Sequence, residues 1–230
     1  MATEYKITIT NNSGSQQNYL IFNEPPKINQ RVQEDVWANV FVKKATPPRQ
    51  TTVITISSLF SAVVGSADSK PGTGVSVSCG VPMPVELGTA DPSGVLARKG
   101  TTYKMFAQDG APQFRQEPTA AGGIINAFEI QTEPFSAGNA VEGNWLIGLG
   151  GDPTGTGLDG PAATFVPQPS KSYQIEPIKK YWVATGDFKK GSMIKVSSVS
   201  SEKIAIDFST RSSRSATIVH AEDGSLNLQA

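Results

Sequence analysis

The sequence predicts an all-β protein: an antiparallel β-sandwich of jelly-roll type with many short strands and at most one short helix. Apolar residues recur with a period of two in many short segments, as in half-buried strands. Turns built from the 22 Gly and 16 Pro residues separate these segments. No long segment has a helical period. With 38% hydrophobic and 17% charged residues, the chain can bury a core, and many short strands of this kind favour a sandwich, jelly roll or barrel.

The first strand is predicted over residues 5–9, where Tyr5, Ile7 and Ile9 alternate with polar residues. Turn-forming Asn, Ser and Gly residues follow at 11–15, and a second apolar run occupies 19–22. We interpret the two runs as an opening hairpin.

The next segments differ in character. Residues 36–42 are apolar on both faces, which is typical of a central strand covered on both sides. Residues 52–56 form another β-branched run. Residues 59–64 have weak helical spacing and are where the one short helix is expected. Over 75–81, three valines and Cys79 alternate with Ser and Gly residues. We therefore predict a short strand whose valine side, including the Cys79 thiol, is buried.

The remaining strands are predicted at 102–106, 124–130, 144–149, 163–166, 173–176, 181–184, 193–196, 203–208 and 216–220. The most loop-like stretches are 66–74 and 88–100. Because the strand between them needs neighbours, one sandwich domain over 1–230 is favoured; the alternative is a split near 88–100.

Composition narrows the class of partner. Twenty basic residues balance twenty acidic ones, which argues against nucleic acid. The doublets Lys179–Lys180 and Lys189–Lys190 are interpreted as solvated strand ends. No signal-peptide pattern opens the chain and no apolar run is long enough to be a transmembrane segment. One cysteine cannot form an intramolecular disulfide, so a cytoplasmic location is expected.

The glycine-rich stretch 148–160 contains a literal G-x-G-x-x-G. A strand-like segment, not a helix, follows it, so no nucleotide cofactor is expected. Asp152 and Asp159 could offer oxygens to calcium, but the dense ligand spacing of a calcium loop is missing. We interpret the stretch as a surface loop and expect no metal and no cofactor.

Catalytic patterns are weak. His220 is the only histidine, which excludes a multi-histidine zinc site within one chain. A Cys79–His220 nucleophile and base pair is disfavoured by the expected burial of Cys79. Convergence of the carboxylates of Glu129, Glu142, Glu176 and Asp207 is not visible in a sequence. An enzyme therefore stays an alternative, with a non-enzyme favoured.

The tryptophans point to recognition. Trp145 shares a strand face with apolar residues and is expected in the core. Trp182 alternates with apolar neighbours and is predicted to point outward, where it would suit stacking on a sugar; a covering loop is the alternative. The predicted ligand site comprises Trp182, Asp152, Asp159 and Asp187. We expect a non-enzymatic, lectin-like protein for carbohydrate or another small ligand, with a self-assembling structural homo-oligomer as the main rival.

Overall fold

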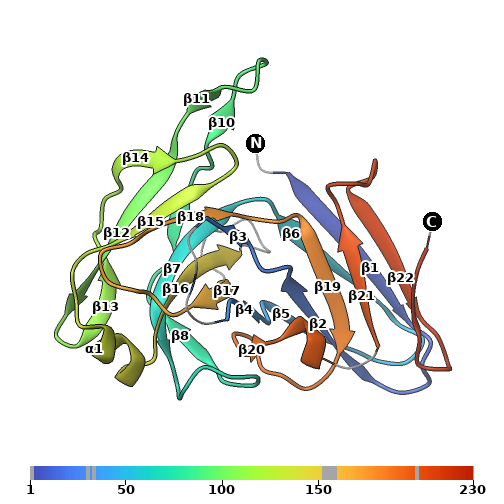
Figure 1. Ribbon diagram of the computed structural model, residues 1–230. Helices are drawn as coiled ribbons and strands as arrows, with labels where there is room; N and C mark the ends of the chain where they lie inside the picture. Colours follow the sequence, from blue (N-terminus) through green and yellow to red (C-terminus); the bar gives the residue numbers. More distant parts are fainter. Residues whose placement is uncertain (1–2, 30–31, 33–34, 152–159, 200–201, 230) are drawn as a thin grey trace.

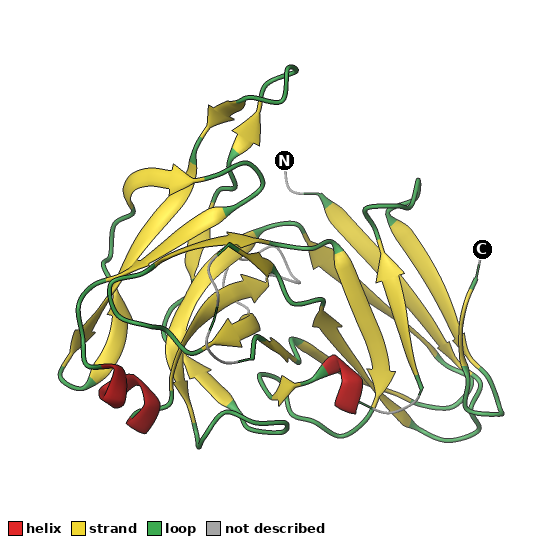
Figure 2. Ribbon diagram, in the orientation of Figure 1, coloured by secondary structure: helices red, strands yellow, loops and turns green. Residues whose placement is uncertain are grey.

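The computed structural model describes residues 3–29, 32, 35–151, 160–199 and 202–229, and these are almost entirely β-strands (Figures 1 and 2). One α-helix, α1 (Ala137–Glu142), and one 3₁₀ turn, η1 (Val196–Ser198), occur among the described residues. The predicted all-β class with one short helix is thus confirmed. Its jelly-roll topology stays a prediction.

Two four-stranded sheets near the chain ends form what we call the terminal sandwich. In order, the first sheet is β23 (Leu226–Leu228), β22 (Ser215–His220), β1 (Glu4–Asn11) and β6 (Thr51–Ser57), and the second is β21 (Lys203–Asp207), β19 (Lys180–Thr185), β2 (Gln17–Asn23) and β5 (Val42–Thr46). Ile7 and Ile9 of the first sheet pack against Tyr19 and Val183 of the second, all fully buried. The alternation of the first predicted strand is therefore confirmed.

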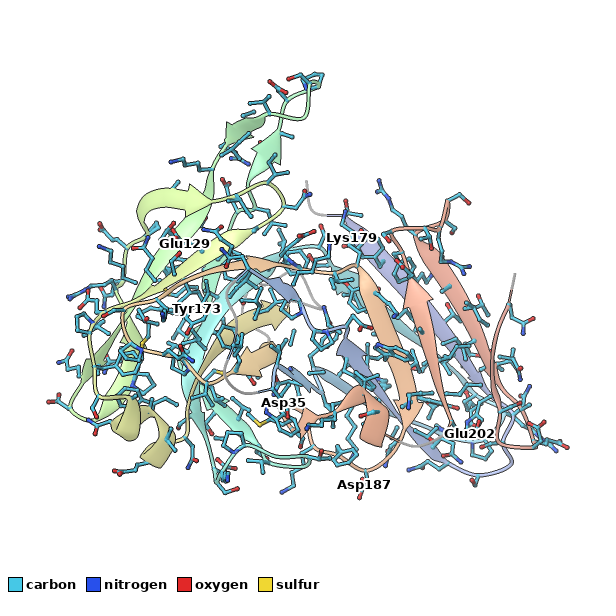
Figure 3. All side chains as sticks on the ribbon, in the orientation of Figure 1. Asp35, Glu129, Tyr173, Lys179, Asp187 and Glu202 are labelled. Carbon is cyan, nitrogen blue, oxygen red and sulfur yellow. The ribbon has the colours of Figure 1, made fainter. Side chains whose placement is uncertain are left out.

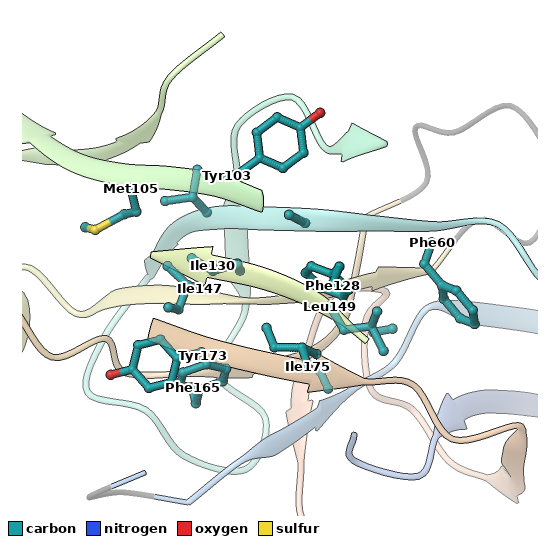
Figure 4. Packing of buried hydrophobic residues seen from close by; sticks show 14 of the residues in the cluster. Phe60, Tyr103, Met105, Phe128, Ile130, Ile147, Leu149, Phe165, Tyr173 and Ile175 are labelled. Carbon is teal, nitrogen blue, oxygen red and sulfur yellow. The ribbon is translucent and has the colours of Figure 1, made fainter. Parts of the chain in front are cut away.

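A six-stranded and a seven-stranded sheet form the central sandwich. The six-stranded sheet has the order β13 (Ala111–Phe114), β12 (Gly100–Gln108), β15 (Phe128–Thr132), β18 (Ser172–Glu176) and β3 (Lys27–Ile28), with β14 (Thr119–Gly123) also on β12. The seven-stranded sheet has the order β20 (Met193–Ile194), β4 (Trp37–Asn39), β17 (Pro161–Phe165), β16 (Trp145–Gly151), β7 (Phe60–Ala67) and β8 (Val77–Cys79), with β9 (Met83–Val85) on β7. Their facing sides bury aromatic and branched residues such as Phe128, Ile147 and Tyr173 (Figure 4).

Strand pairing is mostly antiparallel, with parallel pairs at β1–β22 and β12–β15. The stretch 88–100 forms a hairpin of β10 (Thr89–Ala90) and β11 (Leu96–Arg98), which projects from the central sandwich (Figure 1). The choice between one domain and a split near this hairpin stays a prediction.

The two sandwiches are joined by a third apolar cluster. Leu20 and Phe22, on the far face of β2, pack with Ala38, Val40 and Ile194 from the β4–β20 edge of the seven-stranded sheet. The middle of β2 is thus buried on both faces. The single central strand predicted over 36–42 was wrong, because β4 ends at Asn39 in the seven-stranded sheet and β5 begins at Val42 in the terminal sandwich. The chain passes between the sandwiches at β2–β3, β4–β5, β6–β7, β18–β19, β19–β20 and β20–β21.

Three further local predictions were wrong. The first two strands are not a hairpin: β1 pairs with β6 and β22 while β2 pairs with β5 and β19, so they face each other across a core. Residues 59–64 are not helical, because β7 is held between β16 on one side and β8 and β9 on the other. The valine side of 75–81 is not uniformly inside: Cys79 is half-buried and Val81 is 73% exposed, since β8 ends at Cys79.

Candidate functional site

The outer face of the six-stranded sheet is polar at its centre. Three neighbouring strands, β12, β15 and β18, direct one set of side chains into the core: Tyr103, Met105, Phe128, Ile130, Tyr173 and Ile175. Because side chains alternate along a strand, the residues between these point outward. Strand register then sorts the outward residues into two rows.

The inner row consists of Thr102, Glu129 and Gln174, which are directly opposite one another on the three strands. They are 0%, 5% and 8% exposed. The Thr102 hydroxyl donates to Glu129 Oε2 at 2.8 Å, and the Ser172 hydroxyl donates to Oε1 at 2.5 Å. Within the described part of the chain, the Glu129 carboxylate has these donors and no ion-pair partner. Carboxylates are rarely buried this far without an ion-pair partner.

A glycine segment covers this row. The Gln174 side chain donates to the Gly122 carbonyl at 3.2 Å and accepts from the Ile124 amide at 2.8 Å, so the backbone at 122–124 lies across the sheet. A Cβ at Gly122 would stand 2.0 Å from Glu129 Oε2. Only glycine fits so close to the carboxylate. The Glu129 carboxylate, whose place in the fold is marked in Figure 3, is therefore enclosed by the glycine segment as well as by Thr102 and Ser172.

The outer row consists of Lys104, Gln131 and Ser172, again directly opposite one another and all half-buried. This row lines a cleft of about 400 Å³ together with residues 132–134, 170 and 171. Thr132 orders one wall, since its hydroxyl donates to the Gln168 carbonyl at 2.6 Å and accepts from the Lys171 amide at 2.8 Å. Ser172 belongs to the cleft and also to the Glu129 network.

An arginine closes the rim. Arg115 Nη2 lies 3.0 and 3.1 Å from the two carboxylate oxygens of Glu133, a cleft residue, and the Arg115 guanidinium stands 4.4 Å above the centre of the Phe106 ring. The Glu133 carboxylate, just after β15, is thus tethered to the residue that follows β13, and the Phe106 ring lies beside that arginine. We call residues 104, 131–134 and 170–172 the polar cleft.

The predicted aromatic platform lies elsewhere, on the terminal sandwich. Trp182 is half-buried and packs against the cluster that joins the two sandwiches. Its Nε1–H donates to Glu24 at 2.7 Å, and Lys180 Nζ stands 4.8 Å from the ring centre and 3.0 Å from Glu24. The indole nitrogen and the ring are therefore already in contact with groups of the protein.

The predicted acidic residues are not gathered around Trp182 by any contact of the described residues. Asp187 is exposed and pairs with Lys43 at 2.6 Å; its hydrogen bond with Lys43, and the charge of that lysine, lower the pKa of the carboxyl. Asp152 and Asp159 lie outside the described residues. The ligand site predicted from sequence stays a prediction.

The other candidate groups have structural surroundings. Trp145 is 2% exposed and in the core, as predicted. Cys79 and His220 belong to different sandwiches; burial raises the pKa of the Cys79 thiol to about 12, and His220 Nδ1 lies 3.0 Å from the Tyr19 hydroxyl. Outside the Glu129 network, Glu176 pairs with Lys27 at 3.2 Å, Asp207 accepts from Ser209 in its own turn, and Glu142 is exposed at the end of α1.

Sequence reasoning missed Lys104, Gln131 and Ser172. Each alternates with core residues, so its outward direction was readable from the period of two. What the sequence does not show is that these three strands are neighbours, because β12 and β15 pair in parallel and β18 follows only after the seven-stranded sheet's β16 and β17.

Comparison with known proteins assigns a family. The family model RhiA matches residues 2–230, nearly the whole chain, and the chain therefore belongs to the RhiA family. No curated protein and no solved structure matches. The described residues contain no group of three His, Cys, Asp or Glu side chains that could hold a metal ion. In that same part of the chain, no helix has the length and apolar character needed to cross a bilayer.

Proposed function

We propose that this member of the RhiA family is a non-enzymatic recognition protein that binds a small polyhydroxylated ligand, a carbohydrate first of all, in the polar cleft. One observation carries the proposal: Lys104, Gln131 and Ser172 stand in register on three hydrogen-bonded strands. Strands separated by about 5 Å hold such groups at fixed spacing. A site built on strands loses little conformational freedom on binding, which favours affinity.

The row offers mixed hydrogen-bonding groups. The lysine ammonium only donates, whereas the glutamine amide both donates and accepts. The Ser172 hydroxyl hydrogen is directed to Glu129, so its lone pairs are what it presents to the cleft. A ligand that meets all three must donate and accept within a short distance. Neighbouring hydroxyl groups of a sugar have this property.

The enclosed carboxylate supports the same reading. Glu129 accepts the hydrogen bond of the Ser172 hydroxyl and so fixes its direction. The Glu129 carboxylate is in turn positioned by the Thr102 hydroxyl and by the close approach of Gly122. Burial of a polar group is unfavourable unless its hydrogen bonds are made. We infer that the fold tolerates Glu129 because it sets the direction of a ligand-binding hydroxyl.

A saccharide panel screened by saturation-transfer NMR tests the proposal. Gln131→Ala and Lys104→Ala should abolish the signal of any saccharide that binds the wild-type protein. The matched controls are Gln16→Ala and Lys44→Ala, two exposed residues of the terminal sandwich. Absence of binding across the panel, or equal binding by the cleft variants and their controls, would refute the proposal.

A second candidate, acid–base catalysis, is favoured by one contact, the hydrogen bond that the Ser172 hydroxyl donates to Glu129 Oε1 at the cleft. A hydroxyl with a carboxylate as proton acceptor is the arrangement of an activated nucleophile. Chromogenic esters and glycosides test it. Turnover that is lost in Ser172→Ala would replace recognition by catalysis, whereas recognition alone predicts no turnover.

Location and assembly complete the proposal. We propose a cytoplasmic protein, in keeping with its one free cysteine, which cell fractionation tests. Self-association is a separate hypothesis, supported by the projecting β10–β11 hairpin, where Val95 and Leu96 are 62% and 36% exposed. Sedimentation velocity at rising protein concentration would detect it.

A further inference from the structure

A second cleft lies where the two sandwiches meet. It has a volume of about 330 Å³ and is lined by β3, the start of β7, the turn before β15, the β18–β19 connection and the turn after β21. We call it the junction cleft. Small-molecule sites commonly occupy such junctions and combine an apolar wall with a few polar groups. The polar cleft has no lining residue in common with it.

One part of the wall of the junction cleft is apolar. Phe60, which starts β7, is 9% exposed and lies at one end of the central core (Figure 4). Leu87 packs on the same core, and Ile178 comes from the connection that runs from one sandwich to the other. These three side chains come from three separate segments of the chain. Together they offer a ligand an apolar surface.

The rim carries one uncompensated positive charge. Lys27 pairs with Glu176 at 3.2 Å, so these two charges cancel. The net positive charge of the lining residues is therefore that of Lys179. Among the described residues, Lys179 has no acidic partner, whereas its neighbour Lys180 pairs with Glu24 at 3.0 Å. The Lys179 carbonyl accepts from the Phe208 amide at 2.9 Å, so the backbone that presents the free ammonium is fixed (Figure 3).

An amide group lies in the same lining. Asn126 has a φ of 62°, in the left-handed region that asparagine adopts more readily than most residues. Its own amide donates to the Gly88 carbonyl at 2.8 Å, which holds the turn in place. Asn126 therefore presents a side-chain donor to the cleft from a rigid turn.

We propose that the junction cleft binds an organic anion with an apolar body, the anionic group meeting Lys179 and Asn126 and the apolar body meeting Phe60, Leu87 and Ile178. The Lys179 ammonium has no acidic partner among the described residues, and it therefore favours an anionic group on the ligand. The apolar lining residues favour an apolar part of the ligand, because apolar surface that is removed from water stabilises the complex. This site is independent of the carbohydrate proposal.

Fluorescence titration with 1-anilinonaphthalene-8-sulfonate, an aromatic sulfonate, tests the proposal on the full chain. Lys179→Gln should raise the Kd about tenfold, the loss expected when one charge-assisted hydrogen bond from an exposed ammonium is removed. Ile178→Ala should also weaken binding through lost apolar contact. Lys44→Gln removes the same charge from the terminal sandwich and should leave the Kd unchanged. Matching melting curves would show that the variants fold.

Competition identifies the ligand class. Benzoate should displace the probe and neutral benzamide should not. The proposal is overturned if Lys179→Gln and Ile178→Ala both bind the probe like the wild-type protein, or if benzamide competes as well as benzoate. It is also overturned if Val81→Asp alone abolishes binding, because Val81 lines a different, apolar groove beside Met83 and Phe114.

Discussion

Replacing Gly122 with alanine should destabilise the protein through contact with one enclosed carboxylate. The new Cβ would lie 2.0 Å from Glu129 Oε2 and 2.9 Å from Thr102 Oγ1. Gly122 is not in the left-handed region, so the effect is steric. Overpacking costs about 1–3 kcal/mol, and the reduced entropy of the unfolded chain offsets about 0.4–1 kcal/mol. We expect a net loss of about 1–2 kcal/mol in the free energy of unfolding.

A double-mutant cycle shows whether the contact with Glu129 is the cause. In a Glu129→Ala background the carboxylate is gone, so Gly122→Ala should be neutral or slightly stabilising. The coupling energy between the two positions should then be about 1–2 kcal/mol. Gly138→Ala is the control, because a Cβ there meets only Ser136 Oγ at 3.5 Å within α1.

Urea unfolding, with midpoint and slope fitted separately, measures these quantities. The control should show no coupling to Glu129→Ala and should be more stable than wild type by up to about 1 kcal/mol. If Gly122→Ala and Glu129→Ala add to within about 0.5 kcal/mol, the glycine segment does not enclose the carboxylate and the account of the inner row is wrong.

Four further outcomes are expected. Trp145→Ala should cost about 3–5 kcal/mol through the cavity it leaves, whereas Trp182→Ala should cost about 1–2 kcal/mol by losing its contacts with Glu24 and Lys180; equal losses in urea melts would contradict this. Cys79 should react slowly with a thiol reagent in the native protein and quickly in urea, because burial raises its pKa to about 12; fast native labelling would argue against this environment. Burial also raises the pKa of Tyr19 to about 12. Because the native state holds both protons more tightly than the unfolded chain does, the contribution of these two groups to the free energy of unfolding should be complete below about pH 9 and should fall as the pH rises toward 12. Urea midpoints at about pH 8 and pH 10.5 would show this fall. A chelator should leave the melting temperature unchanged, and a drop reversed by calcium would assign a metal to the glycine-rich loop.

Local periodicity predicted strands well where one face of the strand is buried and the other is exposed to solvent. Residues 5–9 show this, since their alternation survives in β1. It failed over 59–64, because an apolar run buried on both sides carries no period that separates strand from helix. The turn at 11–15 was also correct as a turn, but turn residues do not say which sheet the chain enters next.

The candidate site was harder to predict because it depends on strand neighbours. The alternation in β15 marks Glu129 and Gln131 as outward, but their partners Thr102 and Ser172 come from strands far away in sequence. The opposite error concerns Trp182. β19 directs Trp182 away from the terminal core, but a cluster from β4 and β20 packs on that face, and no local pattern reports such cover.

The pairing of β1 with β22 has a consequence for biosynthesis. β22 is synthesised about 200 residues after β1, so one edge of β1 is completed late. During translation this edge stays open to other chains, which is a hazard for aggregation. The buried contact between Tyr19 and His220 forms equally late. The terminal sandwich is therefore completed only after the last strand of the central sandwich has been made, and we expect slow folding limited by the pairing of β1 with β22.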